Sequence, residues 1–140
     1  MILPDGNVLL YAVTMAAPQH GVALAALQGA CRSGTVAMGW PTLLGFLRLS
    51  TRAGILSRPL PVEQALGVMR AWLDHPGMLV VQPTAQRAAL LASLLIGVGQ
   101  GGPLVSDAHL AVLAIEHGAT LLGFDRDFQR FAGLRFKHLS

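Results

Sequence analysis

The chain has 140 residues and a net charge of +3, with 53% hydrophobic and only 12% charged residues. This length predicts a single domain over residues 1–140 with one substantial core. The composition excludes a disordered chain, which needs low hydrophobicity and high charge. Because few charges are available to cover so apolar a chain, we expect a second copy or another protein to cover part of its surface.

Simple counts exclude three further classes. The single cysteine, Cys31, excludes a disulfide framework and a thiol-rich metal site. No stretch reaches the roughly 18 uninterrupted apolar residues of a membrane span. The first segment, residues 1–10, lacks the basic residues that open a secretory signal. We therefore expect a cytoplasmic protein that makes no membrane contact.

Short apolar runs alternate with longer helical segments along the chain. In chain order we expect a strand at 2–4, helices at 7–13 and 20–32, a strand at 35–38, helices at 42–51 and 61–73, a strand at 78–81, helices at 84–98 and 104–117, a strand at 120–124, a short helix at 128–131 and a strand at 134–138. The strand at 78–81 is continuous, apolar and partly β-branched, so we expect it to be buried on both faces. This alternation predicts an α/β fold in which helices cover both faces of a mainly parallel sheet.

Individual residues mark where some of these helices begin, end and pack. Pro41 fits the first turn of a helix, and Thr84 is expected to cap the helix that follows it. Gly118 is expected to stop the helix before it. Leu66 and Met69 lie at helical spacing and are expected in the core.

Acidic residues follow two of the expected strands. Asp5 comes directly after the first strand, and Asp125 comes directly after the fourth, with Asp127 two residues further on. Ligands of an open α/β sheet bind beyond the carboxyl ends of the strands. These two strands can be neighbours in a doubly wound sheet although they lie at opposite ends of the chain. The three aspartates are therefore candidates for a shared site.

Asp107 is a further candidate because of its place on a helix. On a helical wheel it lies with Ala111 and Ala114, on the stripe that must face the sheet. His109 and Glu116 lie roughly opposite, so we expect these two side chains to face water or a partner. A carboxylate on a buried stripe needs a hydrogen bond, a cation or a metal ion.

The few acids of the chain are concentrated at this rim. Four of the seven acids lie there, and without their four negative charges the rest of the chain carries +7. Gathered carboxylates repel one another and are tolerated as anions only with a counter-ion. Oxygen ligands favour Mg²⁺ or Mn²⁺ over zinc. The sequence leaves open whether the site holds one ion or two. Such a cation polarises a phosphate and lowers the pKa of bound water, which is the chemistry of metal-assisted phosphodiester hydrolysis.

Each acid also has an ordinary structural interpretation. Aspartate is a common helix cap, which would account for Asp107 alone. Asp125 and Asp127 are typical turn residues when they are considered singly. The hypothesis of a site depends on Asp5, Asp107 and Asp125 lying together on one rim.

The ordered set of motifs resembles a known family. The run Asp5-Gly6-Asn7 resembles the opening DxN of PIN-domain ribonucleases. Residues 102–111 resemble their third-acid helix, and residues 116–128 are similar to their final strand and fourth acid. Residues 46–51 and 131–136 resemble the VapC toxins of toxin–antitoxin pairs, particularly the mycobacterial-type subgroup. The resemblance covers the whole chain.

The resemblance implies a PIN-like three-layer α/β/α sandwich and a Mg²⁺- or Mn²⁺-dependent endoribonuclease toxin. It implies RNA as the substrate, a small VapB-like antitoxin as the inhibitor and a homodimer as the assembly. By the same resemblance, Asp5, Asp107 and Asp125 take the catalytic, metal-binding positions. Asp127 would be an accessory metal ligand, and Asn7 would orient the first carboxylate.

Four arginines flank the expected rim, and one acid of the family pattern is missing. The arginines are Arg48, Arg52, Arg126 and Arg130. They would steer RNA phosphates, or they are ordinary solvated charges.

Many PIN nucleases carry a Glu early in the middle helix, where this chain has Gly45.

The missing acid leaves competing functions open. One is a catalytically weak RNA-binding or regulatory module on the same fold. If the protein is instead an active enzyme, Asp127 would compensate for the missing carboxylate. Another is a phosphate-transfer or receiver-like domain that uses Asp5 or Asp125 as the acceptor. This last function lacks a well-placed lysine, because Lys137 lies on the final, exposed strand.

Overall fold

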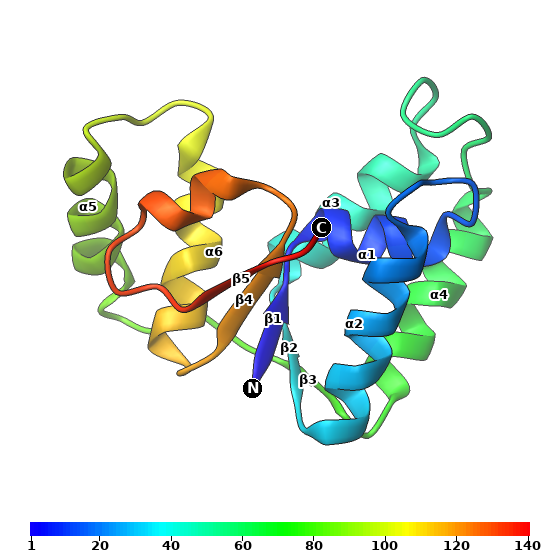
Figure 1. Ribbon diagram of the computed structural model, residues 1–140, viewed down its shortest axis with the longest axis horizontal. Coiled ribbons are helices and arrows are strands. Elements are labelled where there is room, and N and C mark those ends of the chain that lie inside the picture. The colour runs from blue at the N-terminus through cyan, green and yellow to red at the C-terminus, as the bar shows by residue number, and fades with distance from the viewer.

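Five short parallel strands form one sheet through the centre of the molecule (Figure 1). The computed structural model describes all residues from Met1 to Ser140. The strands are β1 (Ile2–Pro4), β2 (Val36–Met38), β3 (Met78–Val80), β4 (Thr120–Gly123) and β5 (Phe136–His138). Their spatial order is β3-β2-β1-β4-β5, and every pair is parallel. The first and fourth strands are therefore direct neighbours at the middle of the sheet.

Helices cover both faces of this sheet (Figure 1). The helices are α1 (Gly6–Val13), α2 (His20–Ser33), α3 (Trp40–Thr51), α4 (Val62–Asp74), α5 (Arg87–Val98) and α6 (Leu104–Glu116), with a short 3₁₀ helix η1 (Arg126–Arg130) after β4. The first four helices lie on one face, and α5 and α6 lie on the other. The predicted α/β/α arrangement is confirmed, with a sheet that is wholly parallel.

Alternation along the strands supplies two apolar cores. Leu3 and Leu121 face the side of α5 and α6, whereas Val36, Met38 and Leu122 face the side of α1 to α4. Successive side chains of a strand point to opposite faces, so even strands of three or four residues contribute to both cores.

No helix of the protein is both long and apolar enough to cross a membrane.

Glycines end two helices where the backbone turns left-handed. Gly99 follows α5 with φ of 69° and donates its N–H to the carbonyls of Leu95 and Ile96. Gly118 follows α6 with φ of 64°, which confirms the predicted stop. Residues with a Cβ rarely adopt this conformation, so glycine is favoured at both points.

The prediction that residues 78–81 form a strand buried on both faces is wrong. The strand β3 lies at one edge of the sheet, and Leu79 at its centre is 48% exposed. A continuous apolar run is typical of a central parallel strand, but the position of a strand in the sheet is set by the connections of the whole chain. The expected core residue Leu66 is also 37% exposed, whereas Met69 is buried.

Thr84 does not cap a helix as predicted. The helix α5 begins three residues later, at Arg87, and its N-cap residue Gln86 makes no side-chain cap bond. The Thr84 hydroxyl instead donates to Glu116 Oε1 at 2.7 Å, and the Thr84 N–H donates to Glu116 Oε2 at 3.0 Å. This pair of bonds ties the segment before α5 to the C-terminal end of α6.

The helix α6 is buried on nearly every side. All residues from 108 to 114 are buried, because α6 packs against the sheet on one side and against α5 and η1 on others. An amphipathic helix buries one stripe, whereas a helix enclosed by neighbours is apolar around its whole circumference. The axis of α6 is consequently held in a fixed position relative to the sheet.

The core beneath η1 provides a test of the fold. Phe128 is fully buried and packs against Phe131 and Phe136. Phe128→Ala is expected to lower the free energy of unfolding by about 3–5 kcal/mol through lost burial and a residual cavity, as measured by urea denaturation. Ile96→Ala, at a side chain that is 79% exposed, is the matched control and is expected to change it by less than about 0.5 kcal/mol. Similar values for the two variants would contradict this packing.

Candidate functional site

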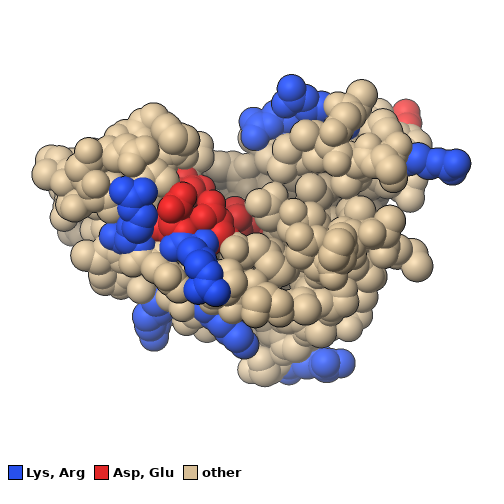
Figure 2. Space-filling model, turned by 45° about the horizontal axis from the view of Figure 1, so that its top comes forward, with Lys and Arg blue, Asp and Glu red and all other residues tan.

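A pocket of about 470 Å³ opens at the carboxyl edge of the sheet. It is enclosed by residues that follow β1 and β4, by the N-terminal parts of α1 and α6, and by one face of α3. Figure 2 shows acidic side chains gathered in a hollow of the surface with basic side chains on both sides. The lining residues of chemical interest are Asp5, Asn7, Gly45, Arg48, Asp107 and Asp125.

Asp5 is positioned by its strand and by the helix that follows it. Its backbone N–H donates to the carbonyl of Leu122 at 2.9 Å, which extends the pairing of β1 with β4. Its Oδ1 accepts from the Gly6 N–H at 2.7 Å, so Asp5 is the N-cap residue of α1. Burial raises the pKa of Asp5, the Gly6 hydrogen bond opposes that rise, and the negative charge of Asp125 adds to it.

Asp107 lies in the first turn of α6 and faces the same pocket. The pKa of Asp107 is raised from an ordinary 3.8 to about 6. Burial is the largest cause, and repulsion from Asp5, Asp125 and Asp127 contributes to the same rise. Repulsion of this kind requires the carboxylates to be close in space. The structure thus brings Asp5 into one pocket with Asp107 and Asp125, about a hundred residues further along the chain. This shared rim was predicted from the positions of Asp5 and Asp125 after strands and of Asp107 at a helix start.

Asp125 and Asp127 lie at the more exposed side of this group. Asp125 caps η1, with its Oδ1 accepting from the Asp127 N–H at 2.8 Å. Asp127 lies 3.9 Å from Arg130 in an exposed ion pair and does not line the pocket. The structure therefore brings Asp125 to the pocket and leaves Asp127 beside it.

The carboxylates do not form a ready metal centre in this structure. No group of three or more His, Cys, Asp or Glu side chains has the geometry to hold a metal ion. The donors are nonetheless all carboxylate oxygens, which Mg²⁺ and Mn²⁺ prefer. Asp5, Asp107 and Asp125 also make no ion pair, so their ionised forms lack a counter-ion. The residues present therefore fit a divalent cation in ligand type and charge.

Two expectations about neighbouring residues have different outcomes. Asn7 lines the pocket, but no hydrogen bond joins it to Asp5, whose Oδ1 is held by the Gly6 N–H. Gly45 lies in the α3 wall of the same pocket, and a Cβ built there would meet no atom within 4 Å. The place where the family pattern puts a glutamate is thus open space in this protein.

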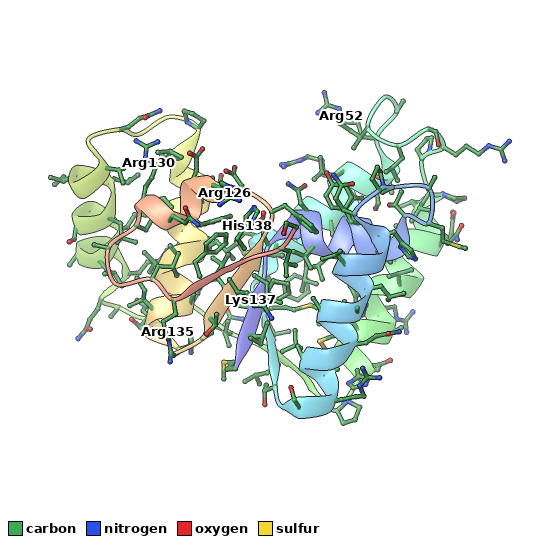
Figure 3. All side chains as sticks on the ribbon, viewed as in Figure 1. Arg52, Arg126, Arg130, Arg135, Lys137 and His138 are labelled. Carbon is green, nitrogen blue, oxygen red and sulfur yellow. The ribbon has the colours of Figure 1, made fainter.

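The four arginines are distributed around the pocket opening. Arg48 is part of the pocket wall itself. Arg126 and Arg130 lie on η1, and Arg52 lies at the end of α3 on the opposite side of the acidic edge (Figure 3). Only Arg130 makes an ion pair, with Asp127. Three of the four cations are therefore free of acidic partners.

His109 is a pocket residue that local sequence patterns did not reveal. It was expected to face water or a partner, but it is only 8% exposed and lines the pocket. The prediction is wrong because α5 covers the face of α6 that a simple helical wheel leaves to solvent. Arg87 of α5 contacts His109 Nδ1. The apolar composition of 87–98 was the available signal, since such a helix needs a neighbour to cover.

The environment of His109 favours its neutral form. Burial lowers the pKa of His109, the Arg87 guanidinium lowers it further, and Glu116 opposes the change. Its Nε2 is buried and has no hydrogen-bond partner. Glu116 itself is directed to Thr84, so it does not contribute a carboxylate to the pocket.

Comparison of the sequence with known proteins gives matches over nearly the whole chain. The family model described as PIN domain matches residues 2–134. Ribonuclease VapC37 of Mycobacterium tuberculosis is 44% identical over 137 residues, which cover 97% of this chain and 95% of that protein. Ribonuclease VapC33 of the same organism is 37% identical, with coverage of 97% and 96%.

Solved structures share the fold at lower sequence identity. VapBC2 from Rickettsia felis, in a structure bound to a promoter DNA fragment, has a TM-score of 0.74 with 19% identity and covers 100% of both chains. VapC20 of Mycobacterium tuberculosis, described as a sarcin-ricin loop cleaving toxin, has a TM-score of 0.72 with 17% identity. That match covers 96% of this chain and 99% of the other.

The raised pKa of Asp107 makes a pH-dependent contribution to stability that can be measured. The folded protein holds a proton on Asp107 up to about pH 6, whereas the unfolded chain releases it near 3.8. The folded state therefore binds more protons between these values, and the free energy of unfolding falls as pH rises through them. Asp107→Asn is expected to remove this fall and to be more stable at pH 7 by about 1 kcal/mol, a value discounted for partial exposure.

Urea denaturation between pH 4 and pH 7 in EDTA measures this effect. The matched control is Asp74→Asn, at an exposed aspartate of α4 outside the pocket, which is expected to follow the wild-type pH dependence. A wild-type protein whose stability rises steadily over this range, in parallel with Asp107→Asn, would show that Asp107 is not held in a repulsive site.

Proposed function

The chain belongs to the PIN-domain family, and from this premise we propose that it is a VapC-type ribonuclease toxin that hydrolyses RNA phosphodiester bonds. The observation that carries the proposal is the gathering of Asp5, Asp107 and Asp125 in one pocket. Burial, together with repulsion from the neighbouring carboxylates, raises the pKa of Asp107 to about 6. A pocket that gathers three acids, none of them in an ion pair, has a stability cost, which is expected where the acids serve a function.

The chemistry we propose uses the acids as ligands and the arginines as an electrostatic guide. Asp5, Asp107 and Asp125 would hold a Mg²⁺ or Mn²⁺ ion, with Asp127 as an accessory acid beside them. When bound, the ion supplies Lewis-acid activation of a phosphate and a hydrolytic water of lowered pKa. The cost of repulsion in the pocket favours such an ion, since a divalent cation neutralises two of the charges.

The substrate must be drawn to an acidic pocket that would itself repel a polyanion. Arg48 in the wall and Arg52, Arg126 and Arg130 around the opening support the proposal that RNA phosphates are attracted to this edge. Asn7 lines the pocket with no hydrogen bond to Asp5. We assign it to contact with the ion or the substrate.

We infer that the toxin works with protein partners. Membership of a family of toxin–antitoxin systems supports a small VapB-like antitoxin as the inhibitor and the cytoplasm as the place of action. Large apolar side chains on the surface support a partner or a second copy of the chain; they include Met15, Trp40, Leu44, Ile55, Val62 and Ile96. A homodimer is the assembly that we propose on this ground.

Loss of cleavage in variants of the acids tests the proposed function. Asp5→Asn and Asp107→Asn are each expected to lower the rate of RNA cleavage by at least about 100-fold, because a charged ligand of the ion is lost. Cleavage of a fluorescent RNA in MgCl₂ or MnCl₂, followed by gel electrophoresis, measures the rate. Glu63→Gln, at an exposed acid of α4, is the matched control and is expected to cleave at the wild-type rate. Undiminished cleavage in EDTA, or in both Asn variants, would overturn the proposal.

The second candidate function, a catalytically weak RNA-binding module, is favoured by one observation. Gly45 leaves open the position at which many relatives of the fold carry a glutamate. RNA binding without turnover, over several metals and RNAs, would favour this alternative. The phosphate-transfer hypothesis gains no support, because Lys137 does not line the pocket.

Restoring an acid at Gly45 distinguishes the two functions. Gly45→Glu is expected to bind Mn²⁺ at least about tenfold more tightly than Gly45→Ala, because one more carboxylate reaches the ion. Isothermal titration calorimetry with MnCl₂ measures the difference. Gly45→Ala is the control, since it also removes the low helix propensity of glycine but adds no charge. Equal affinities would show that this wall of the pocket does not face the ion. If wild type binds RNA without turnover and Gly45→Glu cleaves it, the weak-module function is correct.

A further inference from the structure

One buried polar group of the pocket has no role in the proposed metal chemistry. His109 lies two residues after Asp107 on α6, is 8% exposed and lines the pocket. Its Nε2 is the only buried side-chain nitrogen or oxygen of the protein without a hydrogen-bond partner. Buried polar groups are almost always paired, so a single exception beside a binding pocket indicates a partner that arrives with the ligand.

The contact with Arg87 decides which ring nitrogen carries the proton. A guanidinium group only donates hydrogen bonds, so His109 Nδ1, which Arg87 contacts, must accept. In a neutral imidazole the proton is then on Nε2. His109 therefore holds a fixed N–H donor, and what it lacks is an acceptor.

The chemistry of the pocket identifies that acceptor. The carboxylates Asp5, Asp107 and Asp125 are acceptors in the same pocket, but none is bonded to Nε2. The other side-chain acceptors that line the pocket, on Asn7, Thr42 and Ser106, are not bonded to Nε2 either. The RNA substrate, in contrast, presents a phosphate oxygen pair at every nucleotide. Arg48 in the opposite wall is a second donor suited to the same anion.

We propose that His109 is a substrate-binding residue whose Nε2–H donates to a phosphodiester oxygen of the RNA. This inference rests on the proposed ribonuclease function and names a contact of the same site. Nε2 is covered in the substrate-free protein, so the bond forms when RNA enters and the pocket wall yields locally. Arg87 is a positioning residue, since it keeps Nδ1 as the acceptor and directs the proton to Nε2.

Two substitutions at His109 separate the hydrogen bond from the shape of the ring. His109→Phe keeps an aromatic ring and removes the donor, and it is expected to lower kcat/KM for RNA cleavage about 10- to 100-fold, as for a lost bond to a charged group. His109→Gln places an amide N–H close to the position of Nε2 and is expected to retain most of the wild-type value. His117→Gln, at the far end of α6, is the matched control and is expected to be unchanged.

The outcomes of this experiment separate substrate binding from a structural role. Wild-type kcat/KM in His109→Phe would overturn the proposal. An equal loss in His109→Phe and His109→Gln, with both variants folded by thermal denaturation, would assign His109 to packing alone and would also overturn it.

Nitrogen-15 NMR of the histidine rings tests the contact without any need for turnover. The probe is a random-sequence RNA dodecamer added to Asp107→Asn protein, in which the slowed cleavage leaves the RNA intact during the measurement. We expect a protonated Nε2 and an unprotonated Nδ1 at His109 in the free protein, and a downfield shift of the Nε2 proton on RNA binding. A protonated Nδ1, or RNA binding that leaves the Nε2 proton unshifted, would overturn this inference alone. Absence of RNA binding, together with absence of cleavage by wild type, would overturn the proposed function and this inference with it.

Discussion

The parallel pairing of β1 with β4 is the contact on which the whole pocket depends. Pro4 lies opposite Leu122 in this pair, and the Asp5 N–H continues the pairing to the Leu122 carbonyl. Because parallel strands end at the same edge of a sheet, the residues that follow them meet there. Two acids from opposite ends of the chain thereby become neighbours. The α6 helix, packed on the same strands, supplies the third acid.

The negative charges of the gathered carboxylates lower the stability of the folded protein. Burial and repulsion raise the pKa values of Asp5 and Asp107, so the ionised pocket is less stable than a neutral one of the same shape. The surrounding core compensates, since all residues of α6 from 108 to 114 are buried and hold the helix in place. A divalent cation that binds only the folded state would shift the balance in the opposite direction. The stability of the protein and the occupancy of the pocket are linked through these acids.

Local sequence patterns predicted the elements and the acidic edge, but they did not predict what covers each element. The acids could be found because Asp5 and Asp125 follow strands and Asp107 lies at a helix start, and these are local properties. The edge position of β3 follows from the order of all five strands, and the burial of His109 follows from the packing of α5 on α6. Neither is visible in a window of ten residues. The prediction that Thr84 caps a helix fails for the same reason, since its hydrogen-bond partner Glu116 is 32 residues away in the sequence.

The two walls of the pocket differ in a way that bears on how RNA would lie in it. The acids come from β1, β4 and α6, whereas α3 contributes Gly45 and Arg48 and no acid at all. A metal ion held by the acids would therefore face the α3 wall, which offers the Arg48 guanidinium and the open space at Gly45. A phosphate bridging the two walls would meet the ion on one side and Arg48 on the other. Under the proposed function, the absence of an acid at Gly45 would thus change more than the number of ligands, because the α3 wall would contact the anion rather than the metal.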